Sequence, residues 1–458
     1  MTASTPHTAL IQTFIAGGLL LLNGASAHAA GFYLIDQSVS NMGTAYAGGA
    51  AMAEDASTLY FNPAGITRFE QPQALFAVNA VLEPTLKFRD NGSNHVLLGN
   101  GGLGSDQGAN AGVSAEIPYI YYSQPLSGQL YWGIGVNAPF GLAAKYNPNW
   151  VGRYYAIDSE LKTLNINPSI AYRRDKMSYG VGVNLQYMEA RLSNAIDIGT
   201  INALPVAAGG FGGAFSALGL VPAASDGYIS LQGNDWSWGY NFGVLYEFNK
   251  QHRVGFHYRS SIAHALSGRA DFTIPGNGVI EAGTGLFGDS AVSSAVKMPR
   301  IASISTYHTL NTQWAMMADI TWTQWSSIKE VRFQFDSVQP EAVTTYNWRN
   351  ARRYAIGTSF KASAKLSCRA GIAFDETPVP DSQYRNPRLP DESRTWLTVG
   401  LGYQPSRQWG IDVSYAYLSA DDAQINKTAT GEDALLGGLQ GSYKTGGNTL
   451  SLQIKRVL

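Results

Sequence analysis

The 458-residue chain has a formal net charge of -1, which excludes the strongly basic surface that nucleic-acid binding requires. Only 14% of the residues are charged, whereas 50 glycines, 25 tyrosines and 10 tryptophans favour a lipid-facing aromatic surface over a soluble one. The single cysteine excludes an intramolecular disulfide. No composition shift or charge run divides the chain, so one large domain is the simplest interpretation.

The N-terminus has the pattern of a secretory signal. An apolar run over residues 9–22 precedes Ala27 and Ala29, which have the small-x-small spacing of a cleavage site. The run is shorter than the ~20 residues that a spanning helix needs, which disfavours a membrane anchor. We predict a signal peptide over residues 1–29 and a mature chain that starts near Ala30.

Residues 30–70 differ in composition from the rest of the chain. They are rich in Ala, Gly and Ser, yet they contain too many bulky apolar side chains for a disordered tail. Near the end of this segment stand Asn62, Pro63, Ala64 and Gly65. Pro63 fixes its own φ and biases Asn62 away from the helical region, which predicts a defined turn held by asparagine hydrogen bonds.

Residues 71–458 alternate with a period of two, which indicates β-strands. From Tyr179 to Tyr187 the odd-numbered residues are bulky and apolar, whereas the even-numbered ones are Gly, Asn or Gln. Residues 236–248 and 409–417 behave in the same way. We predict about fourteen strands, near 73–89, 116–125, 131–141, 163–174, 177–192, 230–248, 252–267, 297–308, 312–329, 350–361, 366–375, 395–404, 409–418 and 448–458.

The connections between these strands alternate between short and long. Short ones, at 126–129, 249–251, 363–365 and 405–408, lie between much longer loops. An even-stranded outer-membrane barrel has short periplasmic turns and long extracellular loops. We therefore predict an all-β membrane protein, an antiparallel fourteen-stranded transmembrane barrel over residues 71–458. Such a barrel is wider than the ~8-stranded barrels that side chains fill, and the N-terminal segment is long enough to plug it.

The third expected strand contains residues that break regular pairing. Asn137 is followed by Pro139, Phe140 and Gly141. Proline cannot donate to the ladder and glycine marks a bulge or bend, so both predict a local break. The alternative is an ordinary irregularity near the rim of the barrel.

The long loop between the fifth and sixth expected strands is unusually apolar. It carries Phe211, Phe215, Leu218 and Leu220. Because exposed apolar patches usually mark binding sites, these residues are expected to collect hydrophobic molecules, although the loop could also pack only on itself.

Three arginines are candidates for binding a carboxylate head group, namely Arg191, Arg332 and Arg349. A charged hydrogen bond from a guanidinium would orient such a group. Arg191 could equally be a solvated charge at the rim.

Three stretches of the sequence resemble the FadL family of outer-membrane long-chain fatty acid transporters, which includes hydrocarbon uptake channels. They are "AGFYLIDQSVSNMGTAYAGGAAMAEDASTLYFNPAG" (30–65), "GNDWSWGYNFGVLYEFNKQHRVGFHYRS" (233–260) and "RYAIGTSF…AGIAFDETPVP" (353–380). With the loop rhythm, the resemblance covers nearly the whole mature chain.

The resemblance implies a role for each of the features above. Residues 30–70 would be a hatch inside the barrel, and Asn62-Pro63-Ala64 would be its signature turn. Asp375 would be a wall carboxylate that contacts the hatch, or it could simply cap the start of an extracellular loop. The break at Pro139 would open a gap in the wall for lateral exit, and the apolar loop would collect amphiphiles.

The expected function is uptake of long-chain fatty acids or similar hydrophobic molecules across the outer membrane of a Gram-negative bacterium, by ligand-gated passive diffusion. A channel for aromatic or alkane hydrocarbons is the alternative. We expect no enzymatic activity, because none of the histidines at 95, 252, 257, 264 and 308 has a recognisable serine or acid motif beside it. We also expect no cofactor or metal, a monomer, and outer-membrane lipid and lipopolysaccharide as surroundings.

Overall fold

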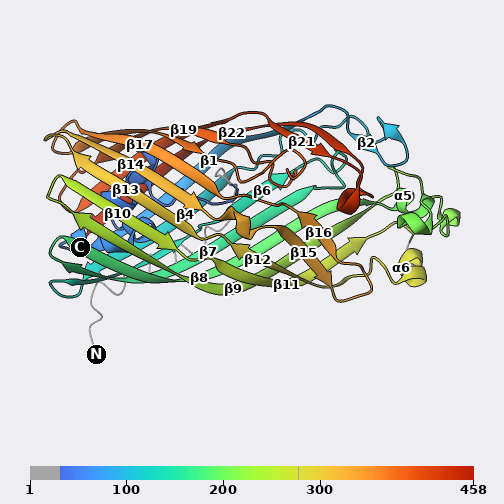
Figure 1. The fold of residues 1–458 in the computed structure, drawn as a ribbon, viewed down its shortest axis with the longest axis horizontal. Coiled ribbons are helices and arrows are strands. Elements are labelled where there is room, and N and C mark those ends of the chain that lie inside the picture. The colour runs from blue at the N-terminus through green and yellow to red at the C-terminus, as the bar shows by residue number, and fades with distance from the viewer. Residues whose placement is uncertain (1–30, 277) are drawn as a thin grey trace.

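The protein is a closed β-barrel with a small domain inside it (Figure 1). The computed structural model describes residues 31–458 except residue 277, so the predicted signal peptide lies outside the described residues. None of the helices in the described part of the chain is long and apolar enough to cross a membrane. The wall has fourteen antiparallel strands, which confirms the predicted fold class.

Twenty strand segments build these fourteen strands, because several strands are interrupted partway. The segments are β1 (Gln73–Asp90), β4 (Ala115–Pro125), β5 (Leu130–Asn137), β6 (Gly141–Lys145), β7 (Asp158–Arg174), β8 (Met177–Asp197), β9 (Asp226–Glu247), β10 (His252–Arg259), β11 (Ile262–Thr273), β12 (Ser290–Met298), β13 (Ile301–Thr309), β14 (Trp314–Thr323), β15 (Glu330–Phe335), β16 (Ala342–Thr345), β17 (Ala351–Lys361), β18 (Leu366–Asp375), β19 (Arg394–Tyr403), β20 (Trp409–Ala420), β21 (Ala423–Lys427) and β22 (Leu439–Val457).

The helices and one small sheet lie outside this ladder. They are α2 (Val39–Met42), α3 (Gly49–Met52), α4 (Thr58–Phe61), α5 (Ile198–Ala203) and α6 (Val279–Thr284), the 3-10 helices η1 (Pro63–Arg68), η2 (Val206–Ala208), η3 (Ser216–Leu218), η4 (Trp325–Ser327) and η5 (Gly431–Asp433), and the hairpin of β2 (Asn94–His95) and β3 (Gly99–Asn100).

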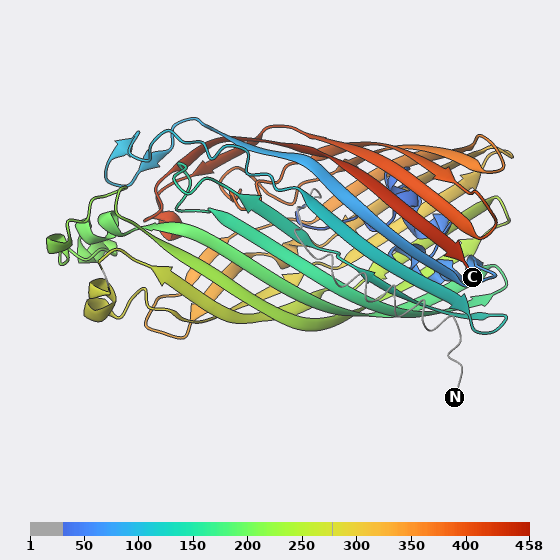
Figure 2. The same ribbon diagram turned by 180° about the vertical axis from the view of Figure 1, so that it is seen from behind.

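The barrel closes where the first and last strands meet. β1 pairs with β22 from Gln73 opposite Val457 onwards, and on its other edge with β4. The two strands lie side by side in Figure 2. No sheet edge is left open at this seam, as a membrane-spanning sheet requires.

The alternation in the sequence reappears as an outer apolar face and an inner polar one. On β8, Tyr179, Val181, Val183 and Leu185 are exposed on the outside, whereas the residues between them are buried. Above this belt the outward residues of the same strand become polar, as at Glu189. The inward residues there, such as Met188 and Leu192, are apolar. The contrast between an apolar outer face and a polar inner face is therefore lost, which explains why the predicted strands were too short at this end.

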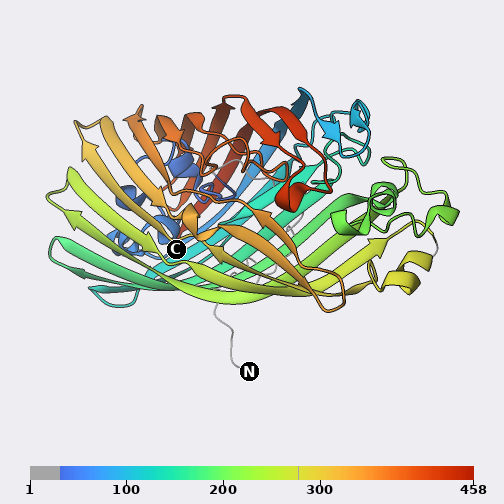
Figure 3. The ribbon, with the colours of Figure 1, turned by 45° about the vertical axis from the view of Figure 1, so that its right-hand side comes forward.

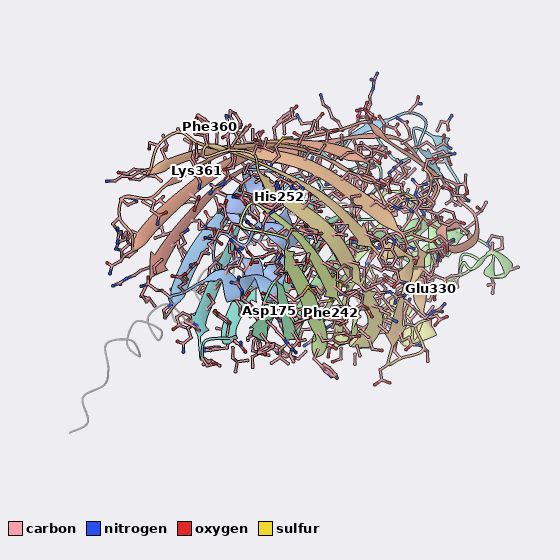
Figure 4. All side chains as sticks on the ribbon, turned by 60° about the vertical axis from the view of Figure 1, so that its left-hand side comes forward. Asp175, Phe242, His252, Glu330, Phe360 and Lys361 are labelled. Atoms are coloured by element: carbon pink, nitrogen blue, oxygen red, sulfur yellow. The ribbon has the colours of Figure 1, made fainter. Side chains whose placement is uncertain are left out.

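Three boundaries show this error most clearly. β7 begins at residue 158 rather than 163, β12 at 290 rather than 297, and β22 at 439 rather than 448. The short turns and the C-terminus lie at one end of the barrel and the long loops at the other (Figure 1). Figure 4 shows the same two ends of the barrel, with Phe360 and Lys361 near the short-turn end and Glu330 toward the long-loop end.

Residues 31–69 fold inside the barrel, toward the end with the short turns (Figure 3). Helices α2, α3, α4 and η1 are each only one or two turns long. Isolated helices this short are not stable, so this hatch depends on its contacts with the wall for its shape. Nearly all of its residues are buried.

Candidate functional site

The Asn62-Pro63 turn fastens the hatch to the wall. The Asn62 amide nitrogen Nδ2 donates to the carbonyls of Ala50, at 2.7 Å, and Val244 on β9, at 3.0 Å. Its Oδ1 accepts from the backbone N–H of Ala64 at 3.0 Å, which caps η1. Pro63 is the first residue of η1, a position where its missing N–H costs nothing. One side chain thus connects two parts of the hatch with one strand of the barrel.

The wall opposite this turn is lined with glycine because the hatch backbone lies directly against it. A Cβ added to Gly243 would lie 1.9 Å from Asn62 Oδ1, and one on Gly180 would lie 2.3 Å from the backbone nitrogen of Ala64. A Cβ on Gly255 would lie 1.8 Å from a hatch carbonyl. These approaches need residues without a side chain.

Arginines of the wall donate to backbone carbonyls of the hatch. Arg253 donates to the carbonyls of Ala51 and Met52, each at 2.5 Å, and Arg353 donates to that of Ala45 at 2.8 Å. Charged hydrogen bonds of this kind are about twice as strong as neutral ones. Sequence reasoning missed these arginines, although a single arginine at an inward position of a barrel strand was the available signal.

Two further wall arginines hold the hatch at other points. Arg259 donates to the carbonyl of Tyr60 at 3.2 Å. Arg369 lies between Glu54 of the hatch, at 2.9 Å, and Asp412 of β20, at 2.8 Å. The hatch is therefore held by polar contacts with several strands around its circumference.

Asp375 lies at the buried end of β18, level with Arg353 on one neighbouring strand and Arg394 on the other. With Tyr33 and Ile35 it lines a small cavity of about 10 Å³. The structure therefore places this carboxylate beside the first residues of the hatch and not beside the Asn62 turn.

The third strand breaks between Asn137, where β5 ends, and Gly141, where β6 begins. The backbone of the residues between them bonds the backbone of the hatch, and its remaining bond to the wall in the described residues is to the Thr163 hydroxyl of β7, which contacts Phe140. Leu34 N–H donates to the carbonyl of Pro139 at 2.8 Å, and Gly141 N–H donates to that of Phe32 at 3.0 Å. The β4–β5 ladder stops one residue before β5 ends, so the wall has no ladder pairing between β4 and residues 138–140.

Aromatic rings gather where the hatch meets this break. Phe32 lies 5.9 Å from Phe140 and 5.0 Å from Trp325, measured between ring centroids. Trp325 belongs to η4, which interrupts the wall between β14 and β15, and it packs on Trp348 at 5.2 Å. Two interrupted strands thus turn side chains toward the same point, and the first described residues of the hatch lie between them.

A small cleft of about 50 Å³, partly open to solvent, lies beside the break. Leu86, Leu142 and Leu389 give it apolar walls, and Arg388 gives it a cation that forms no ion pair within the described part of the chain. Arg394 also lines the cleft but is paired there with Asp391. The remaining lining residues are Pro84, Thr85, Gly112, Val113, Ala143, Pro390 and Thr445. Burial lowers the pKa of Arg388 to about 10, so its guanidinium stays charged at neutral pH. The cleft therefore places one cation beside apolar side chains, the combination that suits an anionic head group.

The three arginines expected to bind a carboxylate do not line this cleft. Arg191 is exposed on the outer face of β8 and pairs with Glu189 at 3.0 Å. Arg332 pairs with Glu330 on β15 at 2.7 Å, and Arg349 is exposed in the connection before β17. The sequence already indicated that the Arg191 side chain points outward, because Arg191 lies four residues after the outward-facing Tyr187 on the same strand.

The predicted apolar loop forms a cluster at the far end of the barrel. Phe211, Phe215, Leu218 and Leu220 pack around the buried Ile201 of α5, with Ile198 and Ile280 in the same cluster. The rings of the two phenylalanines are 5.3 Å apart. Below it, a second apolar cluster on the inner wall includes Leu231 and Val292, and a third contains Phe32 and Phe140. Apolar clusters are therefore found from the outer loops to the break in the third strand.

His95 forms a network with an acid and a hydroxyl that sequence reasoning did not foresee. Its Nε2 lies 2.6 Å from Asp197 Oδ2 and 3.1 Å from Thr200 Oγ1. Its Nδ1 accepts the backbone N–H groups of Leu97 and Leu98. Both ring nitrogens are thus occupied in tying an outer loop to α5, and neither is available as a general base.

Comparison with known proteins identifies this architecture. Residues 20–457 match the family described as "Outer membrane protein transport protein (OMPP1/FadL/TodX)". The chain is 30% identical to a long-chain fatty acid transport protein of Escherichia coli over 89% of its own length and 90% of that protein. It is 29% identical to outer membrane protein P1 of Haemophilus influenzae over 92% of each chain.

Solved structures share the fold. A Pseudomonas aeruginosa FadL homologue superposes with a TM-score of 0.84 at 24% identity, covering 93% of this chain and 100% of that one. The Pseudomonas putida toluene transporter TodX gives a TM-score of 0.65 at 17% identity, covering 94% and 98%. The chain therefore belongs to the FadL family and is an outer-membrane β-barrel that transports long-chain fatty acids or other hydrophobic compounds.

Proposed function

We propose that this protein takes up long-chain fatty acids by ligand-gated passive diffusion and releases them sideways into the membrane at the break in the third strand. The cleft with Arg388 is the observation that carries the proposal. A hydrocarbon channel needs only apolar walls, whereas a guanidinium that bonds only neutral groups, set beside leucines, matches a carboxylate on an apolar chain. Uptake of aromatic or alkane hydrocarbons is the second candidate, favoured by the apolar clusters alone.

The contacts at the break suggest how the solute opens its own exit. Only two backbone hydrogen bonds join Phe32 and Leu34 to Pro139 and Gly141. A solute in the cleft lies next to Leu142, one residue beyond this junction. Displacing the Phe32 side chain from Phe140 would break the junction and expose the unpaired stretch of wall beside β4. Gating therefore requires movement of a few hatch residues and not of the whole hatch.

The head-group assignment is tested by replacing Arg388 with Gln. Its guanidinium bonds only neutral groups, including Ser159 Oγ at 2.9 Å and Asn194 Oδ1 at 3.0 Å, so no buried acid is left unpaired. A charged hydrogen bond contributes about 1.5–3 kcal/mol. We expect binding of oleate to weaken about 10- to 100-fold, while binding of its uncharged methyl ester changes less than about twofold. Fluorescence titration of the purified protein measures both.

Arg191→Gln is the matched control, because it removes the same charge on the outer face. Equal losses for acid and ester in Arg388→Gln would contradict a carboxylate site. A selective loss of oleate binding in Arg191→Gln would instead restore the assignment expected from the sequence.

Capture by the apolar loop is tested by replacing Phe211 and Phe215 with Ser. Each half-buried ring contributes part of the ~1.5–3 kcal/mol of a fully buried one, so we expect a fluorescent fatty acid to bind the loop roughly tenfold more weakly. Val206→Ser, in the same loop but 74% exposed, is the control. Equal effects of the two changes would show that the phenylalanine cluster is not the capture site.

A further inference from the structure

Four outward-facing cations of the upper barrel each pair with an acid two residues away on the same strand. Because residues i and i+2 of a strand point to the same face, these charges neutralise each other locally. The pairs are Lys162 with Glu160 at 2.6 Å, Arg191 with Glu189 at 3.0 Å, Arg269 with Asp271 at 2.8 Å, and Arg332 with Glu330 at 2.7 Å.

The wall around the interruption at η4 departs from this arrangement. Lys297 on β12, Arg300 just before β13 and Arg352 on β17 are all exposed, and none of them forms an ion pair within the described part of the chain. Arg300 donates to the neutral Gln324 side chain. The nearby Glu376 carboxylate accepts from the backbone N–H of Arg352, at 2.9 Å. We call Lys297, Arg300 and Arg352 the cation cluster.

The interruption at η4 brings the cation cluster together. Arg300 and Arg352 stand on either side of β14, whose residue Trp322 is the register partner of Arg352. The hydroxyl of Ser327 in η4 donates to the carbonyl of Lys297 at 3.0 Å. The three cations therefore surround one short break in the wall.

The cation cluster lies at the upper border of the apolar belt. On the same outer face, toward the short-turn end of β13, β14 and β17, lie Ile304, Ile320 and Tyr354, with exposed fractions of 51%, 48% and 40%. A lipid whose acyl chains contact these three side chains places its head group level with the cluster. Basic side chains at this level attract anionic lipid head groups.

We propose that the cation cluster binds the phosphate groups of an outer-leaflet lipid, the lipid A portion of lipopolysaccharide. Three unpaired cations above an exposed apolar surface complement a phosphorylated head group on acyl chains. The site rests on the outer-membrane location of the barrel and does not depend on which solute the barrel transports. Its place beside η4 connects the bound lipid to Trp325, which belongs to that helix and contacts Phe32 of the hatch.

The test replaces Lys297, Arg300 and Arg352 together with Gln in the full-length protein. Binding of purified deep-rough lipopolysaccharide to the protein in detergent is measured with EDTA present, so that bridging divalent cations are absent. Each basic residue near an anionic lipid surface adds roughly a fivefold factor, so we expect binding to weaken roughly 100-fold. The control replaces Arg191, Arg269 and Arg332 with Gln, which removes the same charge, and is expected to change binding less than about threefold. Migration in cold SDS verifies that both barrels are folded.

Dephosphorylated lipid A separates phosphate recognition from acyl-chain contact. We expect it to bind wild type and the cluster variant equally weakly. Equal weakening by the two triple substitutions would show a nonspecific charge effect and overturn the proposal. Undiminished binding of the dephosphorylated lipid to wild type would overturn it as well.

Discussion

Replacing Pro139 with Val and Gly141 with Ala lowers fatty acid uptake about 30- to 100-fold if exit is lateral. Val supplies the backbone donor that proline lacks, and Ala reduces the conformational freedom of glycine. The ladder between β4 and β5 now ends at Val136 of β5. In the variant, residues 138–140 can extend that ladder. Two or three restored hydrogen bonds at about 1 kcal/mol each would lower the population of the state with an open gap in the wall about 30- to 100-fold. Uptake of labelled oleate by cells measures the effect.

Pro168→Val is the control for this experiment, because Pro168 lies on β7 where it pairs with β5 in regular register. We expect near-normal uptake from this control and near-normal binding of a fluorescent fatty acid to the outer loop in both variants. If uptake persists although a structure shows residues 138–140 back in the ladder, the lateral route is wrong and the solute must pass the Asn62 turn.

Replacing Gly180 and Gly243 with Val opens the lumen. The Cβ added at Gly180 would lie 2.3 Å from the backbone nitrogen of Ala64, a contact that no side-chain movement relieves. The one added at Gly243 would lie 1.9 Å from Asn62 Oδ1 and would displace the side chain that fastens the turn. We therefore expect the turn to leave the wall and the conductance in planar bilayers to rise about an order of magnitude, because a fourteen-stranded lumen is wider than side chains alone can fill.

A variant lacking residues 31–65 gives the upper limit of that conductance, and Gly410→Ala is the control. The Cβ of Gly410→Ala would meet only the flexible end of Lys455 at 3.0 Å, so its conductance should equal that of wild type. A porin-like conductance of the intact protein, unchanged by the deletion, would show that the hatch does not block the lumen. Heat-modifiable migration in SDS separates an open barrel from a misfolded one.

The sequence predicted what depends on local alternation. Strands such as β8 and β20 were recognised because their outward residues are bulky and their inward residues small, a contrast that the membrane imposes residue by residue. Where β8 rises above the membrane, the outward residues Glu189 and Arg191 are polar while inward residues such as Met188 are apolar, so the contrast is reversed. The expected break after Asn137 followed from backbone chemistry alone, since neither proline nor glycine suits a central strand.

The parts of the site that could not be predicted depend on distant contacts. Arg388 and Arg394 meet Leu142 in one cleft although some 250 residues of chain separate them, and no local pattern reports that meeting. The inward direction of Arg253 was readable from parity, but its partner, a hatch carbonyl, was not. The hatch itself has no periodicity long enough to reveal its short helices.

The wall holds the hatch through main-chain atoms, with consequences for how the two parts can change. Arg253, Arg259 and Arg353 grip carbonyl oxygens, which every residue possesses, and the facing glycines accommodate a backbone contour. Hatch side chains without a polar contact to the wall could therefore be exchanged for others of similar volume, provided that Glu54, Asp55, Asn62 and Pro63 are kept. A hatch grafted from a relative is therefore expected to bind in this barrel. A single methyl group added to the wall at Gly180 or Gly255 is expected to displace the hatch.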